Sequence, residues 1–182
     1  MAANAIAPGL PGTLEELFQA HHARVFRAAY RITGNPSDAE DVLQTVFLRL
    51  LRQDWTAERV SSLESYLHRA AVNAALDVVR ARRDDRKVAL ETVEPVLGAD
   101  ARLAPDRRQA AAELRSFLRR ALARLSPRAA EMFALRYFEG YGNGEIARML
   151  GASVSNVAVT LHRTRGELQQ QMKEHGIRGD WS

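Results

Sequence analysis

The side chains best suited to contact another molecule lie on a predicted helix near the C-terminus. Its outward side carries Ser155, Asn156, Ala158, Val159, His162 and Arg163, with Arg165 on the flank. Asparagine can pair with adenine through two hydrogen bonds, valine or alanine can contact the thymine methyl group, and arginine can reach guanine or phosphate. The pattern therefore favours a contact with duplex DNA. The alternative is an ordinary packed helix with a hydrated outer face.

A helix-turn-helix pattern positions these side chains. Residues 145–150 read as the first helix, Gly151 suits its left-handed C-cap, and Ser153 can cap the second helix. We expect Ile146 and Leu150 to pack against an apolar side of the second helix formed by Val154, Val157, Leu161 and Leu168. Because many regulators contain such a unit, it indicates a contact but no specific role.

A second candidate surface lies on an acidic helix near the N-terminus. Ser37 and Glu40 have the spacing of a capping box, which predicts that Ser37 begins this helix. Apolar side chains then recur at helical spacing: Ala39, Val42, Leu43, Val46, Phe47 and Leu50. The pattern directs Asp38, Asp41, Gln44 and Thr45 away from that buried face. Acidic residues at a helix start complement the helix dipole without any partner, so the pattern alone leaves docking open.

A third candidate surface lies on a long helix in the middle of the chain. Asn73, Asp77 and Arg80 share one stripe, and Asp77 is well placed for an ion pair with Arg80. Asparagine is mildly unfavourable within a helix, so Asn73 is either a satisfied core amide or a side chain that contacts a base. The end of the helix is basic, with Arg82, Arg83, Arg86 and Lys87.

Composition limits the classes of function. The chain has 182 residues, a formal net charge of +4 and a pI near 9.9, which permits a polyanionic partner. It has no cysteine, and none of its five histidines has the HExxH spacing, so we expect no metal site and no cofactor. No apolar run reaches the roughly 20 residues of a membrane span. The N-terminus does not resemble an export signal, so we expect no membrane insertion and a cytoplasmic protein.

The spacing of apolar residues predicts an all-α fold of two small helical domains joined by a flexible linker. Thr13 can cap the first helix, and Ser126 followed by Pro127 is a typical helix start. We expect a disordered lead at 1–12, a helical bundle at 13–83, a linker at 84–105, a helix-turn-helix domain at 106–174 and a tail at 175–182.

Three motifs in order resemble the extracytoplasmic-function (ECF) sigma factors of the sigma-70 family. The first is Asp38-Ala39-Glu40-Asp41 with Gln44 and Phe47; the second is residues 66–73 with Asp77 and Arg80; the third runs from Leu125-Ser126-Pro127 through residues 135–140 to Glu145-Ile146-Ala147. The resemblance covers nearly everything from Leu14 to Met172. It implies a protein that binds core RNA polymerase and directs it to promoters, usually under the control of an anti-sigma factor.

The resemblance also implies roles for individual residues. Docking on the clamp helices of the β′ subunit would use Asp38, Glu40, Asp41, Gln44, Phe47, Leu48 and Leu51. Recognition and melting of the −10 element would use Trp55, Ser61, Ser62, Asn73, Asp77, Arg80, Arg82 and Arg83. The −35 element would be read by the helix-turn-helix residues named first, and the same domain would contact the β flap.

Two departures from the family pattern stand out. Family members commonly have tryptophan where this chain has Tyr66, and basic or hydroxyl residues where it has Ala158 and Val159. Two alternatives therefore remain: a conventional helix-turn-helix regulator, and a sigma-like decoy that binds polymerase or an anti-sigma factor without opening DNA. No nucleophile–base pair, phosphate loop or metal spacing supports an enzyme.

Overall fold

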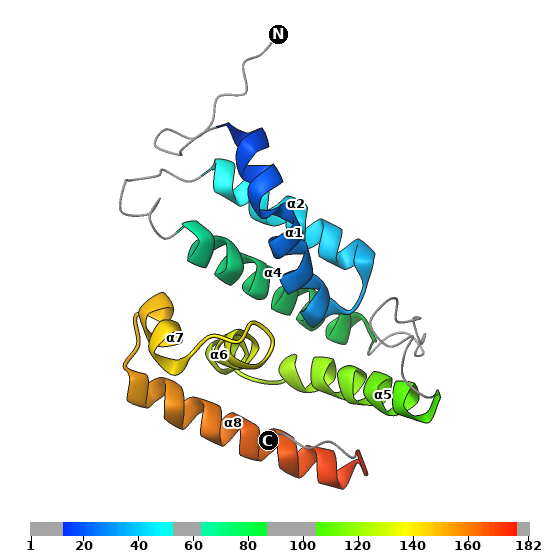
Figure 1. Ribbon diagram of the computed structural model, residues 1–182. Helices are drawn as coiled ribbons and strands as arrows, with labels where there is room; N and C mark the ends of the chain where they lie inside the picture. Colours follow the sequence, from blue (N-terminus) through cyan, green and yellow to red (C-terminus); the bar gives the residue numbers. More distant parts are fainter. Residues whose placement is uncertain (1–12, 53–62, 87–104, 178–182) are drawn as a thin grey trace. The chain divides into compact units, whose positions relative to one another are not determined.

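The computed structural model describes residues 13–52, 63–86 and 105–177, and every regular element within these ranges is an α-helix, as predicted. The helices are α1 (Leu14–Thr33), α2 (Pro36–Leu51), α4 (Leu63–Arg86), α5 (Pro105–Leu122), α6 (Pro127–Tyr137), α7 (Asn143–Leu150) and α8 (Val154–Glu174) (Figure 1). The chain divides into two compact units, Met1–Ala75 and Leu76–Ser182.

The first two helices are fixed by local caps. Thr13 caps α1 as predicted, because its hydroxyl accepts from the Glu16 amide at 3.2 Å while the Glu16 carboxylate accepts from the Thr13 amide at 2.7 Å. The predicted start of α2 at Ser37 is wrong. Asn35 is the N-cap, its Oδ1 accepting from the Asp38 amide at 3.1 Å, and Pro36 occupies the first helical position. Proline is favoured there because its missing N–H would have had no intrahelical partner.

The core of the first unit is formed mainly by small and β-branched side chains. α1 packs along α2, with Val25, Ala28 and Ile32 buried on α1 and Val42, Val46 and Leu50 buried on α2. α4 contributes Leu63, Leu67 and Ala71, and an ion pair between Arg24 and Glu64 links α1 to α4. Leu43, a member of the predicted apolar face of α2, lies further out and is half-buried, and Phe18 of α1 is exposed.

The second unit places α6 and α7 against α8. Its largest fully buried side chains are Leu76, Leu122, Met132, Phe133, Leu135, Ile146 and Leu168. α6 begins as predicted, with the Ser126 hydroxyl accepting from the Ala129 amide at 3.3 Å and Pro127 at the first position. α5 begins at Pro105, the last residue of the predicted linker, and alanines and a Gln109–Glu113 pair support its first turns.

Candidate nucleic-acid interface

The turn between α7 and α8 has a helix cap on each side. Gly151 has φ +58°, and the Ala152 amide donates to the Ala147 carbonyl at 2.9 Å, a Schellman end to α7. Two residues later the Ser153 hydroxyl accepts from the Asn156 amide at 3.1 Å and starts α8. Both caps follow the prediction from the sequence. Together they fix how α8 leaves α7.

An apolar seam holds the two helices against each other. Ile146, Ala147 and Leu150 of α7 are buried, as are four residues of α8: Val157, Leu161, Thr164 and Leu168. The predicted packing of Val154 is wrong, because this side chain is 53% exposed. Val154 is the first residue of α8, so it lies at the end of the helix, where the seam has already ended.

A charged side chain from α6 supports the turn. The Arg128 guanidinium donates from Nη2 to the carbonyl oxygen of Leu150, the last residue of α7. Its Nη1 lies 3.8 Å from Oε2 of Glu131, whose side chain is only 7% exposed. A cation at a helix C-terminus complements the helix dipole and one of the carbonyls that has no partner within the helix. Arg128 therefore ties α6 to the end of α7.

The predicted outward face of α8 is exposed. Ser155, Asn156, Ala158, Val159, His162 and Arg163 are all exposed, and Arg165 on the flank is half-buried. Val159 is 50% exposed and lies about 180° round the helix from the buried line of Val157, Leu161, Thr164 and Leu168. The structure therefore brings together the whole set that the sequence singled out.

Asn156 is held by a neighbour on the same helix. The Thr160 hydroxyl donates to Asn156 Oδ1 at 3.2 Å. This bond uses one of the two lone pairs of the amide oxygen, and the amide nitrogen carries two N–H donors. Asn156 can therefore donate to an acceptor such as a base oxygen, a purine N7 or a phosphate.

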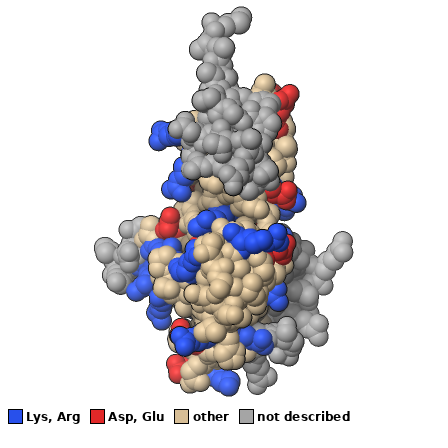
Figure 2. Space-filling model, turned by 90° about the vertical axis from the view of Figure 1, so that its left-hand side faces the viewer, with Lys and Arg blue, Asp and Glu red and all other residues tan. Residues whose placement is uncertain are grey.

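Charged side chains of both signs lie on the two helices. Arg148 of α7 and Arg163 of α8 are exposed, as are Glu145 and Glu167, and Figure 2 shows Lys and Arg side chains spread over one face of the molecule. Neutralising DNA phosphates releases condensed counterions and supplies most of the sequence-independent affinity. Within the described residues no group of three or more His, Asp or Glu side chains is placed to hold a metal ion.

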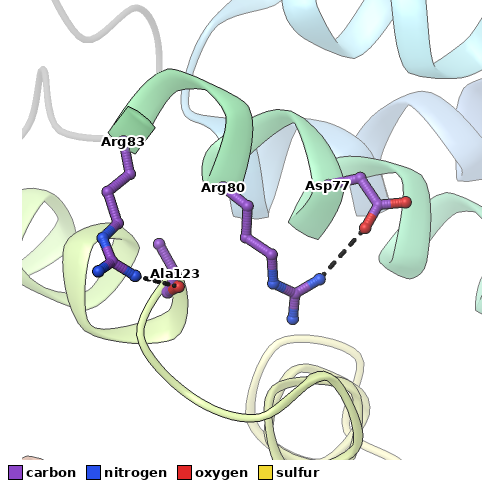
Figure 3. A network of polar contacts seen from close by, with 4 residues as sticks. All are labelled: Asp77, Arg80, Arg83 and Ala123. Atoms are coloured by element: carbon purple, nitrogen blue, oxygen red, sulfur yellow. Dashed lines mark hydrogen bonds and ion pairs between the residues drawn. The ribbon is translucent and has the colours of Figure 1, made fainter. Parts of the chain in front are cut away.

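The stripe on α4 is held by the predicted ion pair. Arg80 Nη1 donates to Asp77 Oδ1 at 3.2 Å, as Figure 3 shows, and Asp77 is exposed. Arg83 is also exposed and donates to the carbonyl oxygen of Ala123, just beyond α5, at 3.1 Å; both residues belong to the unit Leu76–Ser182. Asn73 and Arg82 are half-buried and have polar contacts.

The acidic helix α2 presents a mixed stripe. Asp41, Gln44 and Leu48 are exposed at helical spacing, Leu51 is half-buried, and Glu40 is exposed beside them. Two residues of the predicted docking set do not join this stripe, since Asp38 and Phe47 are buried. Phe47 instead packs edge-on against Phe18 with ring centroids 5.0 Å apart. The surface therefore combines carboxylates with one isolated large apolar side chain, Leu48, which is 53% exposed.

Comparison with known proteins identifies the family. Residues 17–85 match sigma-70 region 2, and residues 118–168 match sigma-70 region 4. The chain is 34% identical over 162 residues to the ECF RNA polymerase sigma factor SigE of Mycolicibacterium smegmatis, covering 88% of this chain and 62% of SigE. It is 32% identical over 154 residues to SigM of Mycobacterium tuberculosis, covering 85% of this chain and 74% of SigM.

The chain belongs to the ECF sigma factors. Two solved structures share its fold. One is CnrH in complex with the cytosolic domain of CnrY, with a TM-score of 0.52 at 22% identity over 88% of both chains. The other is RpoE from Bartonella quintana in complex with the anti-sigma factor NepR, with a TM-score of 0.53 at 20% identity over 87% of this chain and 96% of RpoE. The region 2 match of this sigma factor covers α1, α2 and most of α4, and the region 4 match runs from the end of α5 into α8.

Part of the site of this sigma factor was not evident from its sequence. Arg128 contacts a carbonyl 22 positions away, and no local pattern indicates such a bond. The Thr160–Asn156 pair has four-residue helical spacing and could have been found from it. Trp55, Ser61 and Ser62 lie outside the described residues, as does the predicted Ser61 cap of α4.

Proposed function

We propose that this chain is an alternative sigma factor that binds core RNA polymerase and directs promoter-specific initiation of transcription. One observation carries the proposal: regions 2 and 4 occur in family order in one chain, and region 4 keeps an intact helix-turn-helix with an exposed outward face. The family is not an enzymatic one. The protein would act beside the chromosome, in the cytoplasm, and the described residues contain no helix able to cross a membrane.

The α2 stripe is the proposed docking surface for the β′ clamp helices. Its carboxylates would complement positive charge on the partner and raise the association rate, and burial of Leu48 in the interface would raise the affinity. Full burial of a leucine side chain contributes about 1.5–3 kcal/mol. Because Leu48 is 53% exposed, docking would remove only about half of it from water, and Leu48→Gln should weaken core binding by about 4–15-fold. Arg49→Gln is the matched control, since Arg49 is exposed on the same turn but lies off the stripe.

The α4 stripe and the α8 face are the proposed promoter contacts. Asn73, Asp77, Arg80, Arg82 and Arg83 would bind and open the −10 element, and the outward face of α8 would bind the −35 duplex. A base that is unpaired and trapped by the protein exposes edges that a duplex hides. For this reason a loss of the Asn73 amide should affect opening more than polymerase binding.

We also propose control by an anti-sigma factor. The structural relative RpoE was solved with an anti-sigma factor, NepR, and CnrH with the cytosolic domain of CnrY. A partner of this kind would cover the polymerase-binding or DNA-binding surfaces of the chain. Recovery of a host protein that lowers transcription in the assay below would support this part of the proposal, and failure of every co-purified partner to inhibit would count against it.

The test of the main proposal is run-off transcription on host-genome fragments with purified core polymerase, with and without the full chain. We expect a defined start site that requires the protein, that Asn73→Ala abolishes without loss of polymerase binding, and that Leu48→Gln weakens through polymerase binding. Duplex binding without polymerase and without a new transcript would support a conventional regulator. Polymerase binding by the wild-type chain without any transcript from the whole fragment set would support a decoy.

A further inference from the structure

The centre of the outward face of α8 is an apolar side chain surrounded by polar ones. Val159 lies opposite the buried line of the helix and is 50% exposed. Its neighbours one turn away on this side are Ser155, Asn156, His162 and Arg163, all exposed. A single exposed valine is common on protein surfaces. Here, however, it occupies the position that would point straight into a groove, where the rest of the face offers hydrogen bonds and charge.

The chemistry of the groove narrows what Val159 can contact. Within the major groove of B-DNA the thymine 5-methyl group is the apolar feature of a base edge, and it lies beside the O4 acceptor. Asn156, one turn before Val159, accepts from the Thr160 hydroxyl at Oδ1 and carries two N–H donors. A donor and an apolar side chain on adjacent turns complement the O4 acceptor and the methyl group of one thymine. Cytosine would place an amino donor where O4 stands, facing the Asn156 donors.

The remaining outward surface does not interfere with such an approach. Gly166 lies two turns beyond Val159 on the same side, and a Cβ built on it meets nothing within 4 Å. Ala158 beside Val159 is exposed and short. Ala158 and Gly166 therefore do not hold Val159 away from the groove floor.

We propose that Val159 reads the 5-methyl group of a thymine in the duplex element bound by α8, and that this thymine is a specificity determinant of this sigma factor. The inference rests on the proposed function and deepens it by naming the base feature that the site selects. Val159 would act by direct contact, and Asn156 would select for the adjacent acceptor.

The test replaces thymine by 2′-deoxyuridine, which removes the methyl group and keeps every hydrogen-bonding group. The probe is a promoter fragment from the run-off assay, with each thymine of the upstream element replaced singly, and the readout is its dissociation constant from the reconstituted holoenzyme. At one position or more we expect binding to weaken about fourfold, the equivalent of one buried methyl or methylene group.

Three variants assign the contact. Val159→Ser removes both methyl groups of the side chain with little change in helix propensity, so the uracil penalty should shrink to less than twofold. Val154→Ala is the matched control, because Val154 is an equally exposed valine about 140° round the helix from Val159, and the penalty should remain. Asn156→Ala should weaken the preference for uracil over cytosine at the same position and leave the methyl penalty in place.

Several results would overturn the inference. The first two are an upstream element without thymine, and a uracil penalty below 1.5-fold at every position, where about fourfold is expected. The other two are an unchanged penalty in Val159→Ser, and a penalty that Val154→Ala abolishes equally. In each of these cases the run-off transcript from the unmodified fragment is still present, so the proposed function stands. If that transcript never forms, the proposed function fails first, and the same scan is then made on duplexes selected by the full chain alone.

Discussion

Replacing Arg128 by methionine tests whether the helix-turn-helix is held from outside by α6. Methionine keeps much of the length and apolar volume of the side chain but removes the guanidinium that donates to the Leu150 carbonyl and lies 3.8 Å from Glu131. The perturbation therefore removes a polar support at the C-terminal end of α7 while leaving the buried seam between α7 and α8 intact.

The expected loss of local stability in Arg128→Met depends on how far the Arg128 side chain is exposed to water. Hydrogen bonds that involve a charged group contribute about 1.5–3 kcal/mol, and the C-terminal dipole of a helix adds about 0.3–1 kcal/mol for a nearby cation. The Arg128 side chain is 44% exposed, so water screens part of both terms. We therefore expect a local loss of about 1.5–2 kcal/mol, which corresponds to about 10–30-fold in an opening equilibrium.

Amide hydrogen exchange measures this loss where it arises. The Ala152 amide donates to the Ala147 carbonyl across the end of α7, so it exchanges only when the turn opens. In Arg128→Met we expect it to exchange about 10–30-fold faster, with a partial effect in Arg128→Lys, which keeps the charge and loses the planar fork. Arg124→Met, at another exposed arginine of the same unit, is the matched control. Exchange of Ala152 within twofold of wild type in Arg128→Met would refute this role for Arg128, since the expected change is at least tenfold.

Three further predictions use matched substitutions. Gly151→Ala should lower the free energy of unfolding by about 1 kcal/mol because of its left-handed φ of +58°, whereas Gly166→Ala, within α8 and with open space at its Cβ, should raise it by about 0.5–1 kcal/mol; equal signs in chemical denaturation would contradict this account. Asn35→Ala should cost about 1 kcal/mol through the lost cap and Ser37→Ala less than about 0.5 kcal/mol, and thermal melting showing the reverse order would restore Ser37 as the cap. Burial, and secondarily the nearby Arg24 guanidinium, lower the pKa of His21, so the folded state binds fewer protons than the unfolded state and stability should fall as pH falls below about 6.5. His21→Gln should make this fall in stability shallower, with His22→Gln as the control. An unchanged dependence of stability on pH in His21→Gln would exclude a contribution from His21.

The sequence predicted the helices, and most of the α8 face, because these depend on local patterns. Buried Val157, Leu161 and Leu168 recur at helical spacing, and the remaining positions must then face outward. The caps at Thr13, Ser126, Gly151 and Ser153 were also predicted, because each cap depends only on residues within one helical turn of it. The roles proposed for these and the other surfaces in polymerase and promoter binding remain predictions.

The errors arose where two local signals competed or where a contact was distant. At the start of α2, Asn35-Pro36 and Ser37 with Glu40 are both good helix starts, and the cap that adds a proline at the first position prevailed. This shift of the helix start makes Asp38 the third residue of α2, and it is buried rather than directed outward. Val154 has the spacing of the seam but lies beyond its end, and Arg128 bonds across 22 residues. Periodicity describes one helix at a time, so it cannot locate such contacts.

The turn from Gly151 to Ser153 has a consequence for how this protein can diverge. The end of one helix and the start of the next are both capped within these three residues, so an inserted residue would separate the two caps and change where α8 begins relative to its seam. Such a shift would move Val157 out of the register of the seam. We therefore expect changes of length at this turn to be rare, whereas Val159 and its neighbours contribute little to the core. Drift in promoter preference among descendants should accumulate as replacements on the outward side of α8, with the turn constant in length.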